Sequence, residues 1–209
     1  MPTLLQVDSS PLGESSISRR LSREFVQQWQ KAHPQDTIIT RDLTTSNLKA
    51  IDAEWIGATF TPENARTDGQ KQLLTLSDAL IAELERADEY VFGVPMHNFS
   101  IPSTLKLWID QISRAGKTFA YTAAGPNGLL KNKKATFLVA SGGVYGSDTP
   151  MAAFNFVEPY LRSAFGFIGV TDTTFIHAGG AAAIHSGKTD REAFLQPHFE
   201  SIRAAFKAA

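Results

Sequence analysis

Five short apolar runs alternate along this chain with five longer segments whose apolar residues recur at helical spacing. The runs cover residues 4–7, 37–40, 90–94, 135–140 and 173–176. The helical segments cover residues 16–32, 70–87, 103–113, 154–165 and 190–207. Because parallel strands need long crossover connections, usually helices, this order favours an open parallel sheet with helices on both faces. We therefore predict an α/β fold, a three-layer α/β/α sandwich with a five-stranded parallel sheet.

The length and composition are those of one ordinary globular domain. The 209 residues are 43% hydrophobic and 20% charged, which excludes disordered, collagen-like and coiled-coil chains. We expect a single domain over residues 1–209. The net charge of -1 leaves no positive excess to neutralise a phosphate backbone, so we expect no nucleic-acid partner. Because the chain has no cysteine, thiolate catalysis and cysteine-bound zinc are excluded.

The lengths of the apolar runs also indicate where in the cell the protein is expected. The first residues contain neither a basic start nor an apolar stretch of secretory length. No apolar run approaches the ~20 residues that a membrane-spanning helix needs. We therefore expect a cytoplasmic protein without membrane association.

A serine-rich loop follows the first predicted strand. Residues 9–18 hold five serines, and the first predicted helix begins within them. Hydroxyl groups and the free N–H groups of a helix N-terminus donate hydrogen bonds, and the helix dipole favours negative charge, so this loop suits a phosphate. The alternative is that one serine caps the helix and the others only face water.

The motifs that the chain lacks narrow the type of phosphate ligand. It has no Gly-x-Gly-x-x-Gly, and Ala182 stands where a P-loop ending in Gly187-Lys188-Thr189 needs its first glycine. Dinucleotide and triphosphate cradles are therefore disfavoured, and a terminal monophosphate fits better. Asp42 follows the second predicted strand, where an acid can bind a ribose, but without the glycine loop we interpret it as a structural or surface carboxylate.

Two further loops leave the carboxyl ends of predicted strands, where open α/β sheets bind their ligands. Residues 95–102 combine methionine, histidine, asparagine and phenylalanine between two prolines, a set that suits the edge and face of a planar heterocycle. Residues 141–146 include paired glycines, which let the backbone approach a ligand closely. Either loop can also be a plain connection.

Two connections are longer than usual for such folds. Residues 44–69 contain Phe60, and residues 117–133 contain Phe119, Tyr121 and a glycine-rich turn that is typical of a hairpin. These segments are either tolerated surface insertions or aromatic walls around a site.

Hydrolytic and metal-dependent chemistry finds no support in the sequence. No Gly-x-Ser-x-Gly elbow is present, and the five histidines lack the spacing of a metalloprotease. We therefore expect neither a serine-hydrolase triad nor a metal site.

Several motifs occur together along nearly the whole chain. They are the serine loop at 10–18, Pro95-Met96-His97-Asn98-Phe99, Arg114-Ala115-Gly116 with Thr118-Phe119, Lys133-Lys134-Ala135 before Ser141-Gly142-Gly143, and Gly166-Phe167-Ile168-Gly169. This combination resembles the FMN-dependent NADH:quinone oxidoreductase and azoreductase family, a flavodoxin-like group. The resemblance implies a flavodoxin-like fold with FMN as the cofactor.

The resemblance also implies a role for each of the three loops. The serine loop of the family holds the FMN phosphate, which implicates Ser10, Ser16, Ser18 and the N–H of Ile17. The second loop lies along the isoalloxazine edge, which implicates Met96, His97, Asn98 and Phe99. The third loop lies near the pyrimidine end of the flavin, which implicates Ser141, Gly142 and Gly143.

The reaction implied by the resemblance is a two-electron transfer. Electrons pass from NADH or NADPH to FMN and then to a quinone or an aromatic azo compound at the same site, in a ping-pong mechanism. The flavin supplies the hydride chemistry, so no catalytic residue of the protein is needed. The family and the aromatic insertions also imply a homodimer with the site at its interface, where Phe60, Phe119 and Tyr121 contact the substrate.

Two positions depart from the family pattern. The family usually has tyrosine where this chain has His97, and arginine where this chain has Ser141. Because a histidine changes charge near neutral pH, His97 can modulate a cofactor that becomes anionic on reduction. The alternative is a solvent-facing residue that serves only as a flat wall.

Two other functions stay open at this point. A flavodoxin-type electron carrier that docks on redox proteins would be shorter and strongly acidic, whereas this chain is near neutral and has aromatic insertions. An NADPH-linked dehydrogenase without flavin is the third possibility, and a yellow colour of the purified protein would exclude it.

Overall fold

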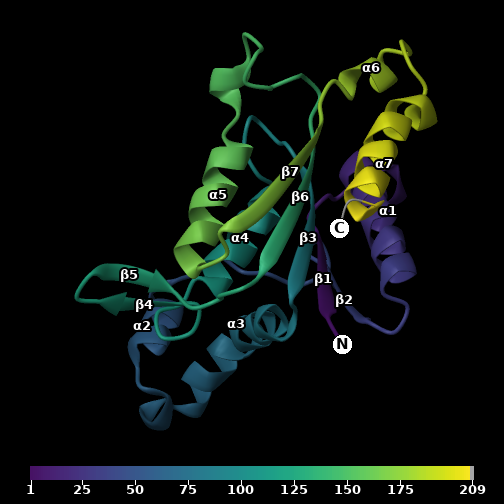
Figure 1. Cartoon of the computed structure of the whole chain (residues 1–209). Helices are drawn as coiled ribbons and strands as arrows, with labels where there is room; N and C mark the ends of the chain where they lie inside the picture. The colour runs from purple at the N-terminus through teal and green to yellow at the C-terminus, as the bar shows by residue number, and fades with distance from the viewer. Residues whose placement is uncertain (208–209) are drawn as a thin grey trace.

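The computed structural model describes residues 1–207, and its centre is a sheet of five parallel strands (Figure 1). Their bounds are Thr3–Asp8 for β1, Thr37–Asp42 for β2, Glu89–Pro95 for β3, Lys134–Ala140 for β6 and Asp172–Ala178 for β7. The strands lie in the order β2-β1-β3-β6-β7, so the order reverses between β1 and β3, as in flavodoxin-like sheets. The five predicted strands and their parallel pairing are confirmed.

One face of the sheet is covered by α1 (Ile17–Ala32) and α7 (Arg191–Lys207), which lie side by side (Figure 1). Leu21, Phe25 and Trp29 recur every four residues along α1, so they share one face of the helix. All three are buried, and they join apolar residues of α7 in one cluster against the sheet. The helical periodicity of the sequence therefore corresponds to the buried face of α1.

The other face is covered by α3 (Asp68–Arg86), α4 (Ser103–Ile112) and α5 (Val157–Ile168). Aromatic rings dominate the core on this side. Phe92 of β3 stacks on Phe137 of β6 with the ring centroids 5.0 Å apart, and both rings are completely buried. Burying a phenylalanine side chain contributes about 1.5–3 kcal/mol, so these rings hold the layer in place. The three predicted layers are confirmed.

α5 begins later than the sequence predicted. Residues 152–154 form a short 3-10 turn instead of the first turn of α5. The Oδ1 atom of Asn155 accepts the N–H groups of Val157 at 3.2 Å and of Glu158 at 3.3 Å. Because asparagine is a preferred residue for binding the free N–H groups at a helix start, the helix begins only after it. The predicted start at residue 154 was wrong.

Two insertions extend the fold at the amino edge of the sheet, the edge at which the strands begin. α4 runs back from the carboxyl edge, so the hairpin that follows it, β4 (Phe119–Thr122) and β5 (Gly125–Gly128), lies at the amino edge. The first insertion forms α2 (Ala53–Phe60), which the sequence did not predict, and α2 packs on α3 (Figure 1). An ion pair of 2.6 Å between Lys117 and Glu63 joins the two insertions.

Short helices occupy the remaining loops. They are η1 (Gly13–Ser15), η2 (Glu63–Ala65), η3 (Ala152–Phe154) and α6 (Ala182–His185). Within residues 1–207, no helix has both the length and the apolar content needed to span a bilayer.

Candidate functional site

The serine loop connects β1 to α1 at the point where the strand order reverses. Ser10, Ser16 and Ser18 are all buried. Ser16 is the N-cap of α1, and its Oγ accepts the N–H of Arg19 at 3.3 Å and lies 3.1 Å from the Oγ of Ser18. The N–H groups of Ile17 and Ser18 are in the first turn of the helix and have no acceptor within it. Hydroxyl and amide donors thus gather at the positive end of α1, where an anion binds favourably.

Contacts with the neighbouring strand hold this loop in place. Ser9 donates both its hydroxyl, at 2.9 Å, and its N–H, at 3.2 Å, to the carbonyl oxygen of Gly93 in β3. At Gly93 itself there is no room for a side chain, because a Cβ atom would collide with the Asp8 carboxylate and lie 3.0 Å from the carbonyl oxygen of Ser18. The start of α1 therefore packs directly on the backbone of β3.

The second loop contains a tight turn with unusual backbone angles. The N–H of His97 donates to the carbonyl of Ser100 at 2.9 Å, and the N–H of Ser100 donates back at 3.1 Å. Asn98 and Phe99, between them, have φ angles of 48° and 71°. Two positive φ angles are typical of a type I′ turn, and a phenylalanine rarely adopts one. Such strain is found at functional sites that are held by their surroundings.

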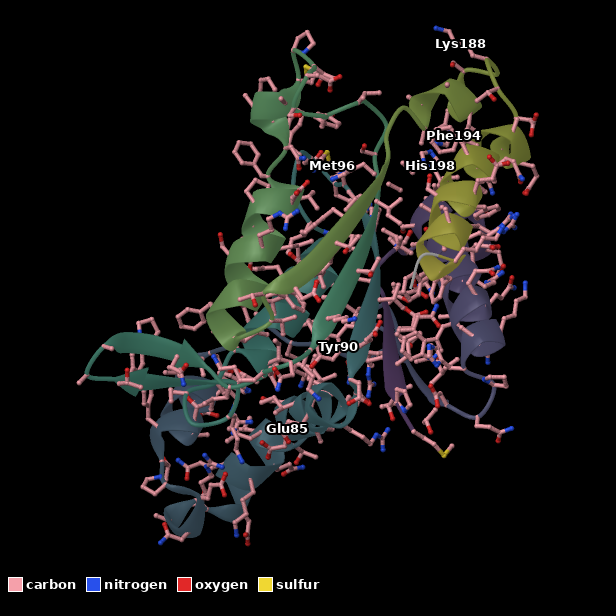
Figure 2. All side chains as sticks on the ribbon, viewed as in Figure 1. Glu85, Tyr90, Met96, Lys188, Phe194 and His198 are labelled. Atoms are coloured by element: carbon pink, nitrogen blue, oxygen red, sulfur yellow. The ribbon has the colours of Figure 1, made fainter. Side chains whose placement is uncertain are left out.

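The side chains of the second loop divide into two groups. His97, Asn98 and Phe99 are exposed, so each is accessible to a ligand. Met96 is half-buried against the core, and Figure 2 shows it at the carboxyl edge of the sheet. Its N–H donates to the carbonyl of Ala140 at 2.7 Å, which ties this loop to the end of β6.

The third loop follows β6 and is anchored to the segment that follows β7. Ser141 is buried, and its Oγ donates to the carbonyl of Gly143 at 2.9 Å. The same carbonyl accepts the N–H of Gly180 at 3.0 Å. Gly142 and Gly143 themselves are exposed, so their backbone lies open at the carboxyl edge.

Aromatic contacts join the second and third loops. The ring of Phe99 lies 5.3 Å from that of Phe154 and 6.3 Å from that of Tyr145, measured between centroids. The carbonyl of Phe99 also accepts the N–H of Phe156 at 3.1 Å. The segment after the third loop therefore supports the strained turn of the second, and all three predicted loops meet at one edge of the sheet.

Two carboxylates lie in register at the ends of β1 and β2, Asp8 and Asp42. Asp8 is buried, and burial raises its pKa, although it accepts the hydroxyl of Ser22 at 2.6 Å. Asp42 is partly exposed, and its hydrogen bonds with Arg19 lower its pKa to about 2. Both acids are held by protein donors. Asp42 is thus a structural carboxylate, as the sequence indicated.

The aromatic residues of the insertions do not join these loops within one chain. Phe119 is only 8% exposed and packs on Phe167, with the centroids 4.6 Å apart. Phe60 and Tyr121 are 78% and 74% exposed. α2 and the hairpin lie at the opposite edge of the sheet from the loop after β6 (Figure 1). Within one chain these residues therefore form no wall around the three loops, and their expected contact with the substrate, which needs a second chain, stays a prediction.

Sequence reasoning missed Arg19, which contacts the serine loop directly. Its Nε donates to the carbonyl of Ser10 at 2.9 Å, and its guanidinium makes two hydrogen bonds of 2.7 Å with Asp42. One signal was present in the sequence. A cation in the first turn of a helix is unfavourable to the helix dipole, which indicates that it has a partner elsewhere in the fold.

One cavity of the described chain lies away from the three loops, and another borders the third loop. The first, of about 860 Å³, is lined by residues of α2 and α3, by the segment that leads from β2 to α2, and by Gln111 of α4. The other, of about 840 Å³, adjoins the third loop at Tyr145, and its wall carries Glu158, which pairs with His177 and Arg162. Within residues 1–207, no group of three or more His, Cys, Asp or Glu side chains is placed to hold a metal ion.

Comparisons with known proteins identify relatives along the whole chain. A family model described as a flavodoxin-like fold matches residues 2–204. A protein of Acidobacterium capsulatum named FMN-dependent NADH:quinone oxidoreductase is 54% identical over 203 residues, which are 97% of this chain and 98% of that protein. A protein of Burkholderia lata named FMN-dependent NADH:quinone oxidoreductase 3 is 49% identical with the same coverage.

Solved structures agree with these relatives. An azoreductase from Bacillus anthracis str. Sterne superposes with a TM-score of 0.88 at 30% identity, and the match covers 100% of both chains. An FMN-dependent NADH-azoreductase from Bacillus anthracis str. Ames Ancestor, solved in complex with FMN, gives a TM-score of 0.87 at 27% identity and covers 100% of this chain and 99% of its own. The chain therefore belongs to the flavodoxin-like family that includes the FMN-dependent NADH:quinone oxidoreductases.

Proposed function

We propose that this chain is an FMN-dependent oxidoreductase that transfers two electrons from NADH or NADPH to quinones and aromatic azo compounds in two half-reactions at one site. The observation that carries the proposal is the meeting of three donor-bearing loops at the point where the strand order reverses. The names of the relatives agree with it, since they specify FMN, NADH and quinone.

The residues at this edge fit the phosphate of FMN. The hydroxyls of Ser10, Ser16 and Ser18 and the N–H of Ile17 are all donors, and the carboxylates nearby are already bound by other side chains. The absence of space at Gly93 is a second point of fit, because a larger residue there would displace the start of α1. We assign these residues to the phosphate.

The other two loops fit the ring system of FMN. When bound, FMN supplies the hydride and two-electron chemistry, and the protein supplies placement and electrostatics. Met96, His97, Asn98 and Phe99 are assigned to the ring edge. Ser141 fixes the third loop so that Gly142 and Gly143 can offer N–H groups to the ring end that becomes negative on reduction.

Absorbance spectra and turnover test this proposal. We expect a yellow purified protein that releases FMN on denaturation and oxidises NADH when a quinone is added. Ser18→Ala should weaken FMN binding about tenfold or more, because a hydrogen bond to a charged group contributes roughly 1.5–3 kcal/mol. Ser15→Ala is the matched control, since Ser15 is exposed in the same loop. A colourless protein would contradict the proposal, and flavin without turnover would favour an electron carrier.

A homodimer belongs to the same proposal. Phe60 and Tyr121 are exposed at the amino edge, far from the loops of their own chain, and exposed aromatic side chains are typical of interfaces. In a dimer they would contact the substrate over the partner's loops. Light scattering should give twice the 22.8 kDa of one chain, and a monomer at working concentration would contradict the dimer. The cytoplasmic location expected from the sequence stays a prediction, which cell fractionation would check.

A further inference from the structure

We infer that Arg19 and Asp42 form a positioning pair that sets the geometry of the serine loop for a phosphate ester. The inference rests on the proposed phosphate site, to which it adds two residues that touch the loop rather than the ligand. The evidence for this positioning role is the set of hydrogen bonds that Arg19 makes. The backbone N–H of Arg19 binds the Oγ of Ser16, and its Nε binds the carbonyl of Ser10, at 3.3 and 2.9 Å. One residue therefore fixes both ends of the loop.

Asp42 holds the guanidinium in the orientation that these contacts need. Its Oδ2 and Oδ1 atoms each accept one N–H from the two terminal nitrogens of Arg19 at 2.7 Å. Oδ1 also accepts the N–H and the hydroxyl of Thr44 at 2.9 and 2.7 Å. The planar guanidinium fork matches a carboxylate in this two-pronged way, which a lysine does not. The end of β2 thus anchors the loop that follows β1.

The charges indicate positioning rather than direct attraction of a phosphate. The Arg19 and Asp42 side chains are 14% and 32% exposed, so the pair is partly shielded from water. Asp42 neutralises the guanidinium, and both terminal nitrogens of Arg19 are used by this carboxylate. The contact that remains toward the loop is Nε to a backbone carbonyl. Arg19 therefore acts through the position of Ser10 and Ser16.

This distinction gives opposite expectations for Asp42→Asn. If the pair positions the loop, loss of the carboxylate loosens Arg19 and weakens the binding of a phosphate ester. If Arg19 attracts the phosphate by its charge, loss of the carboxylate frees that charge and strengthens binding. Arg19→Lys also distinguishes positioning of the loop from attraction by charge, because lysine keeps the positive charge and lacks the planar fork.

The experiment equilibrates each purified holoprotein with mixtures of FMN and riboflavin and measures the ratio of the bound flavins. Riboflavin lacks only the phosphate, so this ratio isolates the phosphate site from general stability. Asp42→Asn and Arg19→Lys should each lower the preference for FMN about tenfold, the equivalent of one lost hydrogen bond to a charged group. Glu14→Gln is the matched control, because Glu14 forms a comparable two-pronged pair with Arg23 of α1 but is exposed.

Two results would overturn the positioning pair. One is an increased preference for FMN in Asp42→Asn, and the other is a wild-type preference in both variants, which an equal loss of FMN and riboflavin would also give. Ser18→Ala, measured in parallel, shows whether a negative result concerns the positioning pair alone or the phosphate site as well. If Ser18→Ala lowers the preference and the pair variants do not, the positioning pair alone fails. If Ser18→Ala has no effect either, the proposed phosphate site fails with it.

Discussion

The two edges of the sheet are built from different kinds of contact. At the carboxyl edge, buried hydroxyls and the amide groups at the start of α1 remain as hydrogen-bond donors around the serine loop. At the amino edge, the hairpin packs its apolar residues on the end of α5, and Phe119 contacts Phe167 there. Donors that the protein leaves free favour a small polar ligand, whereas exposed aromatic rings favour a larger apolar partner. The difference assigns ligand binding to the first edge and association to the second.

Gly128→Ala tests the amino edge and should have the largest effect. A Cβ atom at Gly128 would collide with the backbone of Ile168 and Gly169, which cannot move aside as a flexible side chain can. We expect the free energy of unfolding to fall by about 3 kcal/mol, the upper part of the usual range for overpacking. Urea denaturation measures it. Gly57→Ala is the control, since its Cβ would lie in open space within α2 and should stabilise the helix by about 0.5–1 kcal/mol.

Gly93→Ala makes the corresponding change at the carboxyl edge. Its Cβ would meet the Asp8 carboxylate and the carbonyl of Ser18, so the start of α1 must shift. We expect a loss of about 2 kcal/mol in stability together with weaker FMN binding. Fluorescence of the FMN released on dilution measures the binding. Gly128→Ala should leave the FMN affinity of the folded fraction unchanged, and a similar loss of affinity in both variants would remove the contrast between the edges.

The pH dependence of the stability of Asp42→Asn tests the ion pair with Arg19 that anchors the serine loop. The pKa of Asp42 falls from the ordinary ~3.9 to about 2 on folding, so its stabilisation is complete above the ordinary value and is lost as the pH falls through about 2. The full shift corresponds to about 2.5 kcal/mol, which solvent screening of this partly exposed pair reduces to about 1 kcal/mol. Denaturation curves should differ at pH 6 and converge toward pH 2. A constant difference over this range would argue against the ion pair as its cause.

Asp8→Asn should give the smallest change, with the opposite pH dependence. Burial raises the pKa of Asp8, so the free energy of unfolding decreases as the pH rises from the ordinary pKa to the raised one and stays lower above it. Asparagine removes this cost and can still accept the hydroxyl of Ser22. We expect the variant to be more stable than the wild type at pH 7 and equal to it near pH 4. A loss of stability at pH 7 would show that the buried charge contributes favourably.

Local sequence patterns were enough to predict the layers and the three loops. The short apolar runs and the four-residue spacing of Leu21, Phe25 and Trp29 are local patterns, and each corresponds to one strand or one helix face. The serine loop and the paired glycines could be found because such turns follow strands in a known order. Local sequence patterns were sufficient to predict those features whose contacting residues are also close together in the chain.

The contacts between distant segments could be known only from the folded chain. The pairing of Arg19 with Asp42 depends on the parallel register of β1 and β2, which no local pattern specifies. The start of α5 was set by the side chain of Asn155 rather than by apolar spacing. The sequence did not show that Phe60 and Tyr121 lie at the edge opposite the loops of their own chain, which leaves a second chain to bring them to the site. The spacing of apolar residues predicts which face of a helix or strand is buried, whereas the path of the chain in space determines which distant residues come into contact.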